Sequence, residues 1–333
     1  MEISERIKAF VDLGVLFNEM SNKPYNHKVV NQAILANNFF VKENISFSFK
    51  SLSQILTKKK ITKWLYSYSI DKEICKTVLV ICAGNIPLVA FHDILCVLIL
   101  GNKLILKPSS KDYILIHFVI QKLIEIQPKF KSLISFSKIN THCDMVICTG
   151  NNISANYFKY HFKNKPAIIR SSKTSICILS GDESEQELHE LCNDIFLHFG
   201  LGCRNVTKIY IPKSYNLDVL KHYFQRYISN LNCQIYKDNY IYNKALFLLE
   251  NANFKDFQNI LMVESKKTHP PISVLFYSYY DNLADVNFNK NDIQCIVSNV
   301  YTKLKTIPFG KTQLPELSDY ADGIDTISFL LSE

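Results

Sequence analysis

The first half of the chain alternates short, wholly apolar runs with stretches whose apolar residues recur at helical spacing. Before residue 70 only the helical pattern is present. The apolar runs that follow predict strands at 76–87, 102–108 and 144–150. The stretches after these runs predict helices at about 88–100, 112–126 and 154–162. Because the strands are apolar throughout rather than alternating, we expect a parallel sheet that helices cover on both faces.

The second half of the chain repeats this alternation. Apolar runs predict strands at 174–180, 206–212, 271–277 and 294–298, with a further helix at about 216–228. The helix before 206–212 begins at a capping box formed by Ser184 and Glu187, and we expect it to end at Gly200, a common helix C-cap. With no internal repeat or low-complexity linker, the pattern predicts an α/β fold.

Composition narrows the class of protein. Of the 333 residues, 47% are hydrophobic and 20% are charged, so the chain is too apolar to be disordered. The formal net charge of +8 is scattered, and its one dense run, the lysines at 58–60, is typical of a solvated face rather than of a nucleic-acid site. The surplus favours an anionic ligand such as a nucleotide or coenzyme A.

The pattern of apolar and cysteine residues indicates a cytoplasmic protein with no integral membrane segment. The N-terminus shows no secretory signal, and the longest apolar stretch, 86–100, is too short for a membrane span. The ten cysteines contain no CxxC pair and no Cys/His spacing of zinc type. We therefore expect free thiols in a reducing compartment and no metal site.

Cys203 differs from the other cysteines because it lies in a turn between a predicted helix and a predicted strand. Gly200 and Gly202 would let a ligand approach the backbone, and the neighbouring cation of Arg204 would lower the pKa of a nearby thiol. These features fit a nucleophile, although a buried structural cysteine stays open on this ground alone. We expect His198 to be a cation at the end of the helix.

Five motifs in order along the chain resemble those of the aldehyde dehydrogenase superfamily. The segment AGNIPLVAFHDILCVLILGNKLILKPSSKD at 83–112 resembles the Asn-x-Pro loop and the later Lys-Pro-Ser segment of that superfamily. ICTGNN at 147–152 resembles its Thr-Gly dinucleotide turn, and FGLGCRNVTKIYIP at 199–212 resembles its nucleophile segment. PFGKTQLPELSDYADGID at 308–325 resembles its late Pro-Phe-Gly segment. The AGN-x-P loop, GLGCRN and YADG-x-D most resemble the LuxC-like acyl-CoA reductases, which reduce long-chain fatty acyl groups.

The resemblance implies an aldehyde dehydrogenase-like fold and assigns its parts. It implies a nicotinamide-cofactor domain at 1–172, with N-terminal helices and a Rossmann-like sheet. A catalytic domain would follow at 173–305, and a C-terminal segment at 306–333 would return to the domain interface. Cys203 would be the nucleophile that takes the acyl group, and Asn85 would form the oxyanion hole with the backbone N–H of Cys203.

The cofactor residues implied by the resemblance follow the strands of the first half. Lys107 would bind the adenosine ribose and Gly150 would lie near the pyrophosphate; Ser109 and Thr149 belong to the same two segments. Where members that prefer NAD carry a glutamate, this chain has Ser110 followed by a lysine, which favours NADPH over NADH. The segment after Gly150 lacks a later glycine of the family, and this leaves open a different fit to the pyrophosphate.

The chain lacks the glutamate that activates the hydrolytic water in oxidising members. The corresponding stretch, IIRSSKTS at 168–175, retains only the lysine at 173. The resemblance therefore implies reduction of an acyl-CoA to an aldehyde through an acyl-Cys203 enzyme. An acyl-phosphate reductase, an acyl-transfer or carrier protein acylated on Cys203, and a non-catalytic binding protein stay open. Partners would be the acyl-CoA and an acyl-activating or acyl-carrier protein; acyl chain length and a homo-oligomer stay open.

Overall fold

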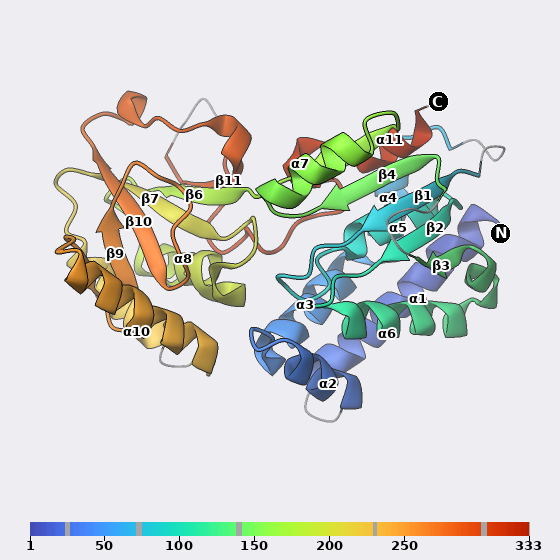
Figure 1. Cartoon of the computed structure of the whole chain (residues 1–333), viewed down its shortest axis with the longest axis horizontal. Helices are drawn as coiled ribbons and strands as arrows, with labels where there is room; N and C mark the ends of the chain where they lie inside the picture. Colours follow the sequence, from blue (N-terminus) through green and yellow to red (C-terminus); the bar gives the residue numbers. More distant parts are fainter. Residues whose placement is uncertain (24–26, 71–74, 138–141, 229–231, 301–304, 333) are drawn as a thin grey trace. The chain divides into compact units, whose positions relative to one another are not determined.

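The computed structural model describes residues 1–23, 27–70, 75–137, 142–228, 232–300 and 305–332. The chain forms two compact units, each with its own sheet (Figure 1). Unit 1 comprises Met1–Ser172 and Glu316–Glu333, and unit 2 comprises Lys173–Pro315. Among the described residues, no helix has the length and apolar character needed to cross a membrane.

Unit 1 is built on a parallel sheet of five strands in the order β3-β2-β1-β4-β5. The strands are β1 (Thr77–Ile81), β2 (Lys103–Lys107), β3 (Ile134–Phe136), β4 (Met145–Thr149) and β5 (Ala167–Arg170). This confirms the predicted parallel sheet, whose strands at 76–87, 102–108 and 144–150 become β1, β2 and β4. The short strands β3 and β5 complete the two edges.

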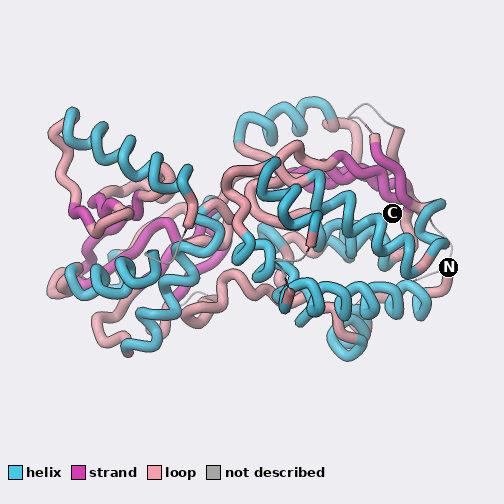
Figure 2. Tube along the Cα trace, turned by 90° about the horizontal axis from the view of Figure 1, so that it is seen from below, coloured by secondary structure: helices cyan, strands magenta, loops and turns pink. Residues whose placement is uncertain are grey.

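Helices cover both faces of the sheet in unit 1, with the strands between them in Figure 2. The helices are α1 (Ile3–Asn22), α2 (Lys28–Ala36), α3 (Lys42–Ile55), α4 (Lys58–Leu65), α5 (Phe91–Ile99), α6 (Tyr113–Ile126), α7 (Asn152–His161) and α11 (Thr326–Leu331). Alternate residues of β1 enter two cores: Val78 and Val80 join the α1 side, while Leu79 and Ile81 join Phe158 of α7. Burial on both faces explains why the strands are apolar throughout.

Unit 2 contains a six-stranded sheet in the order β11-β6-β7-β10-β9-β8. Its strands are β6 (Thr174–Ile178), β7 (Val206–Pro212), β8 (Lys255–Asp256), β9 (Leu261–Glu264), β10 (Val274–Tyr280) and β11 (Ile293–Val297). All pairs are parallel except β8 with β9. The helices are α8 (Glu185–Phe196), α9 (Asp218–Ile228) and α10 (Gln234–Leu249). The predicted α/β class is therefore confirmed in both halves of the chain.

Short 3-10 helices and the chain end complete the units. The 3-10 helices are η2 (Pro128–Ser132), η3 (Leu197–Gly200), η4 (Leu283–Asp285), η5 (Lys290–Asp292) and η6 (Ala321–Gly323). Ile307 forms a bridge with Val297 at the edge of the unit 2 sheet. After residue 315 the chain joins unit 1, where Thr326 accepts a 3.0 Å hydrogen bond from Arg170 of β5. The segment 306–333 is thus divided between the two units.

Candidate active site

The turn that carries Cys203 follows an abrupt helix end. The capping box at the start of α8 forms as predicted, because Ser184 and Glu187 each accept a hydrogen bond from the other's backbone N–H. The helix then ends at Phe196, before the Gly200 expected from the sequence. His198, Phe199 and Gly200 have φ values of 54°, 58° and 74°, so three consecutive residues adopt the left-handed conformation. This conformation reverses the chain and leads it into β7.

Asn205 fixes this turn to the helix. Its side-chain amide donates to the backbone carbonyls of Asp194, Ile195 and Leu197 at 3.1, 3.3 and 2.8 Å. Its Oδ1 accepts a 2.8 Å hydrogen bond from the backbone N–H of Gly202. The side chain is fully buried, so one residue satisfies helix carbonyls and closes the turn around Cys203. Sequence reasoning gave Asn205 no role, although Asn in a glycine-containing turn is a signal for side-chain to backbone bonding.

Cys203 itself is half-buried, and its turn is tied to two strands. Its backbone carbonyl accepts a 3.0 Å hydrogen bond from Ser175 Oγ in β6, and this hydroxyl oxygen accepts one from the N–H of Cys295 in β11. The guanidinium of Arg204 donates to Cys295 Sγ at 3.3 Å. The backbone of the turn is therefore held from both neighbouring strands and from the helix.

Most other cysteines are poor nucleophiles for a physical reason. Of the ten, eight are buried, Cys75 is exposed and Cys203 is half-buried. Burial raises the pKa of the Cys148 and Cys192 thiols to about 12, which disfavours the reactive thiolate. Cys203 and Cys75 are thus the cysteines that are not buried, and Cys203 lies in the turn between Gly202 and Asn205 that leads into β7.

The end of α8 also holds the Pro-Phe-Gly segment. Asp194 is fully buried and accepts hydrogen bonds from the backbone N–H of Gly310 at 2.7 Å and of Thr312 at 3.1 Å. Its carboxylate also accepts a 2.7 Å bond from the Thr312 hydroxyl, while burial raises its pKa to about 6. The segments at 202–205 and 308–312, both singled out by resemblance, therefore share one helix as their support.

His198 is not the helix-end cation expected from the sequence. The side chain is buried, and burial lowers its pKa to about 4, so the imidazole is neutral at pH 7. The expectation was wrong because the helix ends two residues before His198, and the left-handed turn carries that residue into the core.

The site residues predicted in unit 1 lie at the carboxyl ends of the sheet strands, which we call the carboxyl edge of the sheet. Asn85 follows β1, Lys107 ends β2, and Thr149 ends β4. Because β1 lies between β2 and β4 and all three strands are parallel, their carboxyl ends adjoin. The chain runs from β1 through β2 to β3 on one side and then crosses to β4 on the other side of β1. The carboxyl ends of β1 and β4 therefore flank the topological switch point, where such sheets bind ligands.

Two of these loops are in close contact. A Cβ at Gly84 would lie 2.6 Å from both Cβ and Oγ of Ser109, so only glycine permits the approach. The loop that carries Asn85 therefore packs directly on the turn after Lys107. Asn85 and Ser109 are half-buried, whereas Ser110 is exposed.

The segment after Gly150 forms a helix, α7, that begins two residues later at Asn152. Asn151 caps α7 by accepting a 2.8 Å hydrogen bond from the N–H of Ser154. A Cβ at Gly150 would lie 2.9 Å from Cβ of Ser154, so glycine is required for this tight entry into the helix. Gly150 thus precedes a helix N-terminus, which is a favourable place for a phosphate group.

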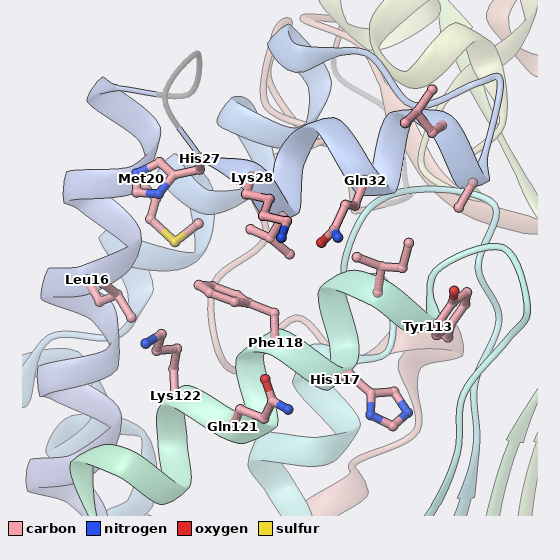
Figure 3. A pocket seen from close by; sticks show the side chains of 14 residues that line it. Leu16, Met20, His27, Lys28, Gln32, Tyr113, His117, Phe118, Gln121 and Lys122 are labelled. Carbon is pink, nitrogen blue, oxygen red and sulfur yellow. The ribbon is translucent and has the colours of Figure 1, made fainter.

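A groove on unit 1 lies apart from these residues. It has a volume of about 1080 Å³ and lies between α1, α2 and α6 (Figure 3). It is lined by Leu16, Met20, His27, Lys28, Val29, Gln32, Leu35, Ala36, Tyr113, Ile114, His117, Phe118, Gln121 and Lys122. None of the site residues predicted from the sequence is among them.

Over the described part of the chain, no group of three or more His, Cys, Asp and Glu side chains could hold a metal ion.

Comparison with known families identifies a matching family model. The model of a family described as acyl-CoA reductase (LuxC) matches residues 21–234, a range that includes Asn85, Lys107, Gly150 and Cys203. No curated protein sequence matches the chain.

Solved aldehyde dehydrogenases have a similar fold. The NAD⁺ complex of an aldehyde dehydrogenase from Bacillus cereus is 13% identical, with 89% of this chain and 72% of that chain covered and a TM-score of 0.64. Aldehyde dehydrogenase 21 from Physcomitrella patens, in complex with its product succinate, is 11% identical, with 90% and 74% covered and a TM-score of 0.69. A Mycobacterium tuberculosis aldehyde dehydrogenase complexed with NAD⁺ is 15% identical, with 86% and 70% covered and a TM-score of 0.62. These similarities confirm the predicted aldehyde dehydrogenase-like fold.

Proposed function

Since the chain belongs to the acyl-CoA reductase (LuxC) family, we propose that it reduces a fatty acyl-CoA to the aldehyde with a nicotinamide cofactor. The observation that carries this proposal is the placement of Cys203. Within the matched range, it is a half-buried thiol in a turn held by Asn205 and Ser175, whereas burial disfavours the thiolate at most other cysteines. An acyl-transfer enzyme needs such a fixed, reachable sulfur.

In the proposed reaction, Cys203 forms the covalent bond to the acyl group. Its thiolate attacks the thioester carbonyl, the carbonyl oxygen becomes an oxyanion, and collapse expels coenzyme A as a thiolate that takes a proton from solvent. The family resemblance assigns stabilisation of this oxyanion to the side-chain amide of Asn85 and to the backbone N–H of Cys203, each as a hydrogen-bond donor. A reduced nicotinamide, when bound, would supply the hydride that reduces the acyl group to an aldehyde.

The sheet edge of unit 1 fits such a cofactor. Gly150 stands directly before a helix N-terminus, and Lys107 ends β2, which is separated from β4 by β1 alone. The carboxyl ends of these strands therefore offer backbone N–H groups for a phosphate and a cation for another anionic part of the cofactor. We assign cofactor binding to Lys107, Ser109, Ser110, Thr149 and Gly150 in unit 1, and the covalent chemistry to unit 2. The Bacillus cereus and Mycobacterium tuberculosis structures are NAD⁺ complexes, which supports a nicotinamide.

We further propose that NADPH is preferred over NADH. Ser110 and Lys111 are both exposed at the turn after β2, and residues 107–111 include no carboxylate. A serine hydroxyl and an ammonium group can bind a 2′-phosphate, which a carboxylate in their place would repel.

The first prediction tests whether the protein reduces acyl-CoA and whether Cys203 is required for this reaction. Acyl-CoA-dependent oxidation of NADPH should occur in the wild-type protein and fall to background in Cys203→Ala, because the acyl-enzyme cannot form. Cys75→Ala, which removes the exposed cysteine, should retain turnover. Absorbance at the nicotinamide band gives the rate, and aldehyde trapping identifies the product.

The other outcomes separate the alternatives. Turnover with an acyl phosphate but not with acyl-CoA would show that the substrate is an acyl phosphate rather than a thioester. Stable acylation of Cys203 without consumption of cofactor, followed by transfer to another thiol, would identify an acyl-transfer protein. Equal turnover in Cys203→Ala and the wild type would refute the proposed nucleophile.

A further inference from the structure

Asp112 stands at the start of α6 but does not cap that helix. It occupies the N-cap position, yet its side chain accepts no hydrogen bond from the first turn of α6. Instead Oδ2 accepts a 2.8 Å hydrogen bond from the backbone N–H of Leu88, 24 residues earlier in the chain. Aspartate at an N-cap ordinarily bonds to its own helix, so this side chain serves the loop after β1.

Leu88 is a residue whose conformation needs such support. It lies three positions after Asn85 and has a φ of 58°, in the left-handed region that a branched side chain rarely adopts. Its side chain is only 3% exposed, and its carbonyl accepts a 3.0 Å hydrogen bond from the N–H of Phe91 at the start of α5. The bond that the Leu88 N–H donates to Asp112 therefore fixes the point where the Asn85 loop turns into a helix.

The same turn contacts the loop on the other side of Asn85. The position of a Gly84 Cβ would be 3.2 Å from Cβ of Asp112, and Ser109 lies closer still. Residues 84 and 88 thus both rest on the turn at 109–112, and Asn85 lies between them. The turn at 109–112 therefore contacts the loop both before and after Asn85, the residue proposed to bind the oxyanion.

The chemistry of the carboxyl group fits a neutral tether. Asp112 is 2% exposed, and over the described residues its Oδ1 has no hydrogen-bond partner. Burial raises the pKa of this carboxyl well above its ordinary range. In the neutral form, one oxygen carries the proton and the other still accepts from Leu88, so the hydrogen bond does not depend on a charge.

We propose that Asp112 is a positioning residue, which holds the loop of Asn85 in the geometry that oxyanion stabilisation requires. The inference rests on the function proposed for Asn85. It assigns to Asp112 no contact with substrate or cofactor, and its effect on catalysis passes through Asn85.

A structural experiment tests the tether without any turnover. Asp112→Ser introduces a residue that is favoured at helix N-caps but is too short to reach Leu88, whereas Asp112→Asn keeps an acceptor at the same position. Amide hydrogen exchange of the full chain is read on peptides that cover residues 84–90. Asp112→Ser should speed exchange there by about tenfold or more, and Asp112→Asn should leave it near the wild-type rate.

The matched control lies at the opposite end of the same strand. Asp144 accepts a 2.7 Å hydrogen bond from the backbone N–H of Thr77, where β1 begins. Asp144→Ser removes the same kind of bond, but away from the carboxyl edge. It should change neither exchange at 84–90 nor the turnover number.

Kinetics then test the link to Asn85. Removal of one oxyanion donor costs about 10²–10³-fold in kcat, so this is the loss expected for Asn85→Ala. Misplacement of that donor should cost Asp112→Ser about 10²-fold in kcat, with little change in KM for acyl-CoA. The double variant should lie within about threefold of Asn85→Ala alone, because both changes remove one interaction. Asp112→Asn should recover most of the turnover.

Each result has a defined meaning. Wild-type exchange at 84–90 in Asp112→Ser, fully additive losses in the double variant, or no recovery in Asp112→Asn would overturn the inference. Faster exchange in Asp112→Ser together with a wild-type protein that reduces no acyl-CoA would support the tether and refute the proposed function instead.

Discussion

At the scale of single residues, one buried amide and one buried carboxylate organise the surroundings of Cys203. Asn205 bonds to three helix carbonyls and to Gly202, and Asp194 bonds to the segment at 310–312. The motif GLGCRN made the cysteine recognisable from the sequence. The role of the asparagine could not be predicted, because it depends on where the preceding helix ends in space.

Replacement of Asn205 should damage both stability and activity. Asn205→Ala leaves buried carbonyls and the Gly202 N–H without their partner, and each buried unsatisfied group costs about 1–3 kcal/mol. We expect a loss of about 2–4 kcal/mol in the free energy of unfolding, measured by urea denaturation. The exposed Asn216, which bonds to the N–H of Asp218, provides the control: Asn216→Ala should cost less than about 1 kcal/mol. Equal losses in the two variants would contradict this role of Asn205.

Two buried groups at the end of α8 should give opposite pH dependences of stability. The pKa of His198 is lowered from 6.5 to about 4, so its contribution is complete above pH 6.5 and is lost as pH falls toward 4. The pKa of Asp194 is raised from 3.8 to about 6, so its contribution is complete below pH 4 and is lost as pH rises through 6. Each pKa shift changes the free energy of unfolding by about 3 kcal/mol across its pH range. Because the two changes have opposite signs over nearly the same range, they largely cancel in the wild type.

Single variants should reveal the two contributions. Relative to the wild type, the free energy of unfolding of His198→Asn should rise as pH falls from 6.5 to 4, since Asn tolerates the left-handed backbone and does not titrate. That of Asp194→Asn should fall over the same range. Urea denaturation at a series of pH values measures both, and parallel profiles for the three proteins would show that neither group titrates as described.

At the scale of elements, apolar runs located the strands that are buried on both faces, β1, β2, β4, β6, β7 and β10. The strands β3, β5, β8 and β9 were not predicted, because they have three to five residues fewer than the longest strands and lie toward the sheet edges. The helix α10 was also missed, since only Tyr236 and Asn243 of its residues are fully buried and no apolar stripe marks it.

The packing of one loop on another gives a prediction at this scale. Gly84→Ala places a methyl group 2.6 Å from Ser109 and should force the Asn85 loop away from the turn after β2, at a cost of about 1–3 kcal/mol in stability and with a loss of turnover. Because the added atom meets the Ser109 side chain, the double variant Gly84→Ala with Ser109→Gly should regain stability. Thermal unfolding and kcat report the two effects, and an unchanged kcat in Gly84→Ala would argue against the need for this contact.

At the scale of the whole molecule, the sequence predicted two α/β regions and the family, but not the full path of the chain. Resemblance located five motifs. The structure puts the three of the first half at the carboxyl ends of the strands in unit 1, and it attaches the other two to α8. The division of the segment after residue 305 between the units was not predictable, because no linker or change of composition marks residue 315. The order of strands follows from tertiary pairing, which periodicity does not encode.

The most direct test of the proposed function is the covalent acyl-enzyme. The full-length protein is incubated with a long-chain acyl-CoA in the absence of a nicotinamide, and intact mass and peptide mass spectrometry follow. We predict an increase in mass equal to one acyl group, located on the peptide that contains Cys203, with release of one coenzyme A thiol; Cys203→Ala should show neither. Aldehyde formation by a protein that carries no acyl group on Cys203, or an adduct located on another residue, would contradict the proposed mechanism.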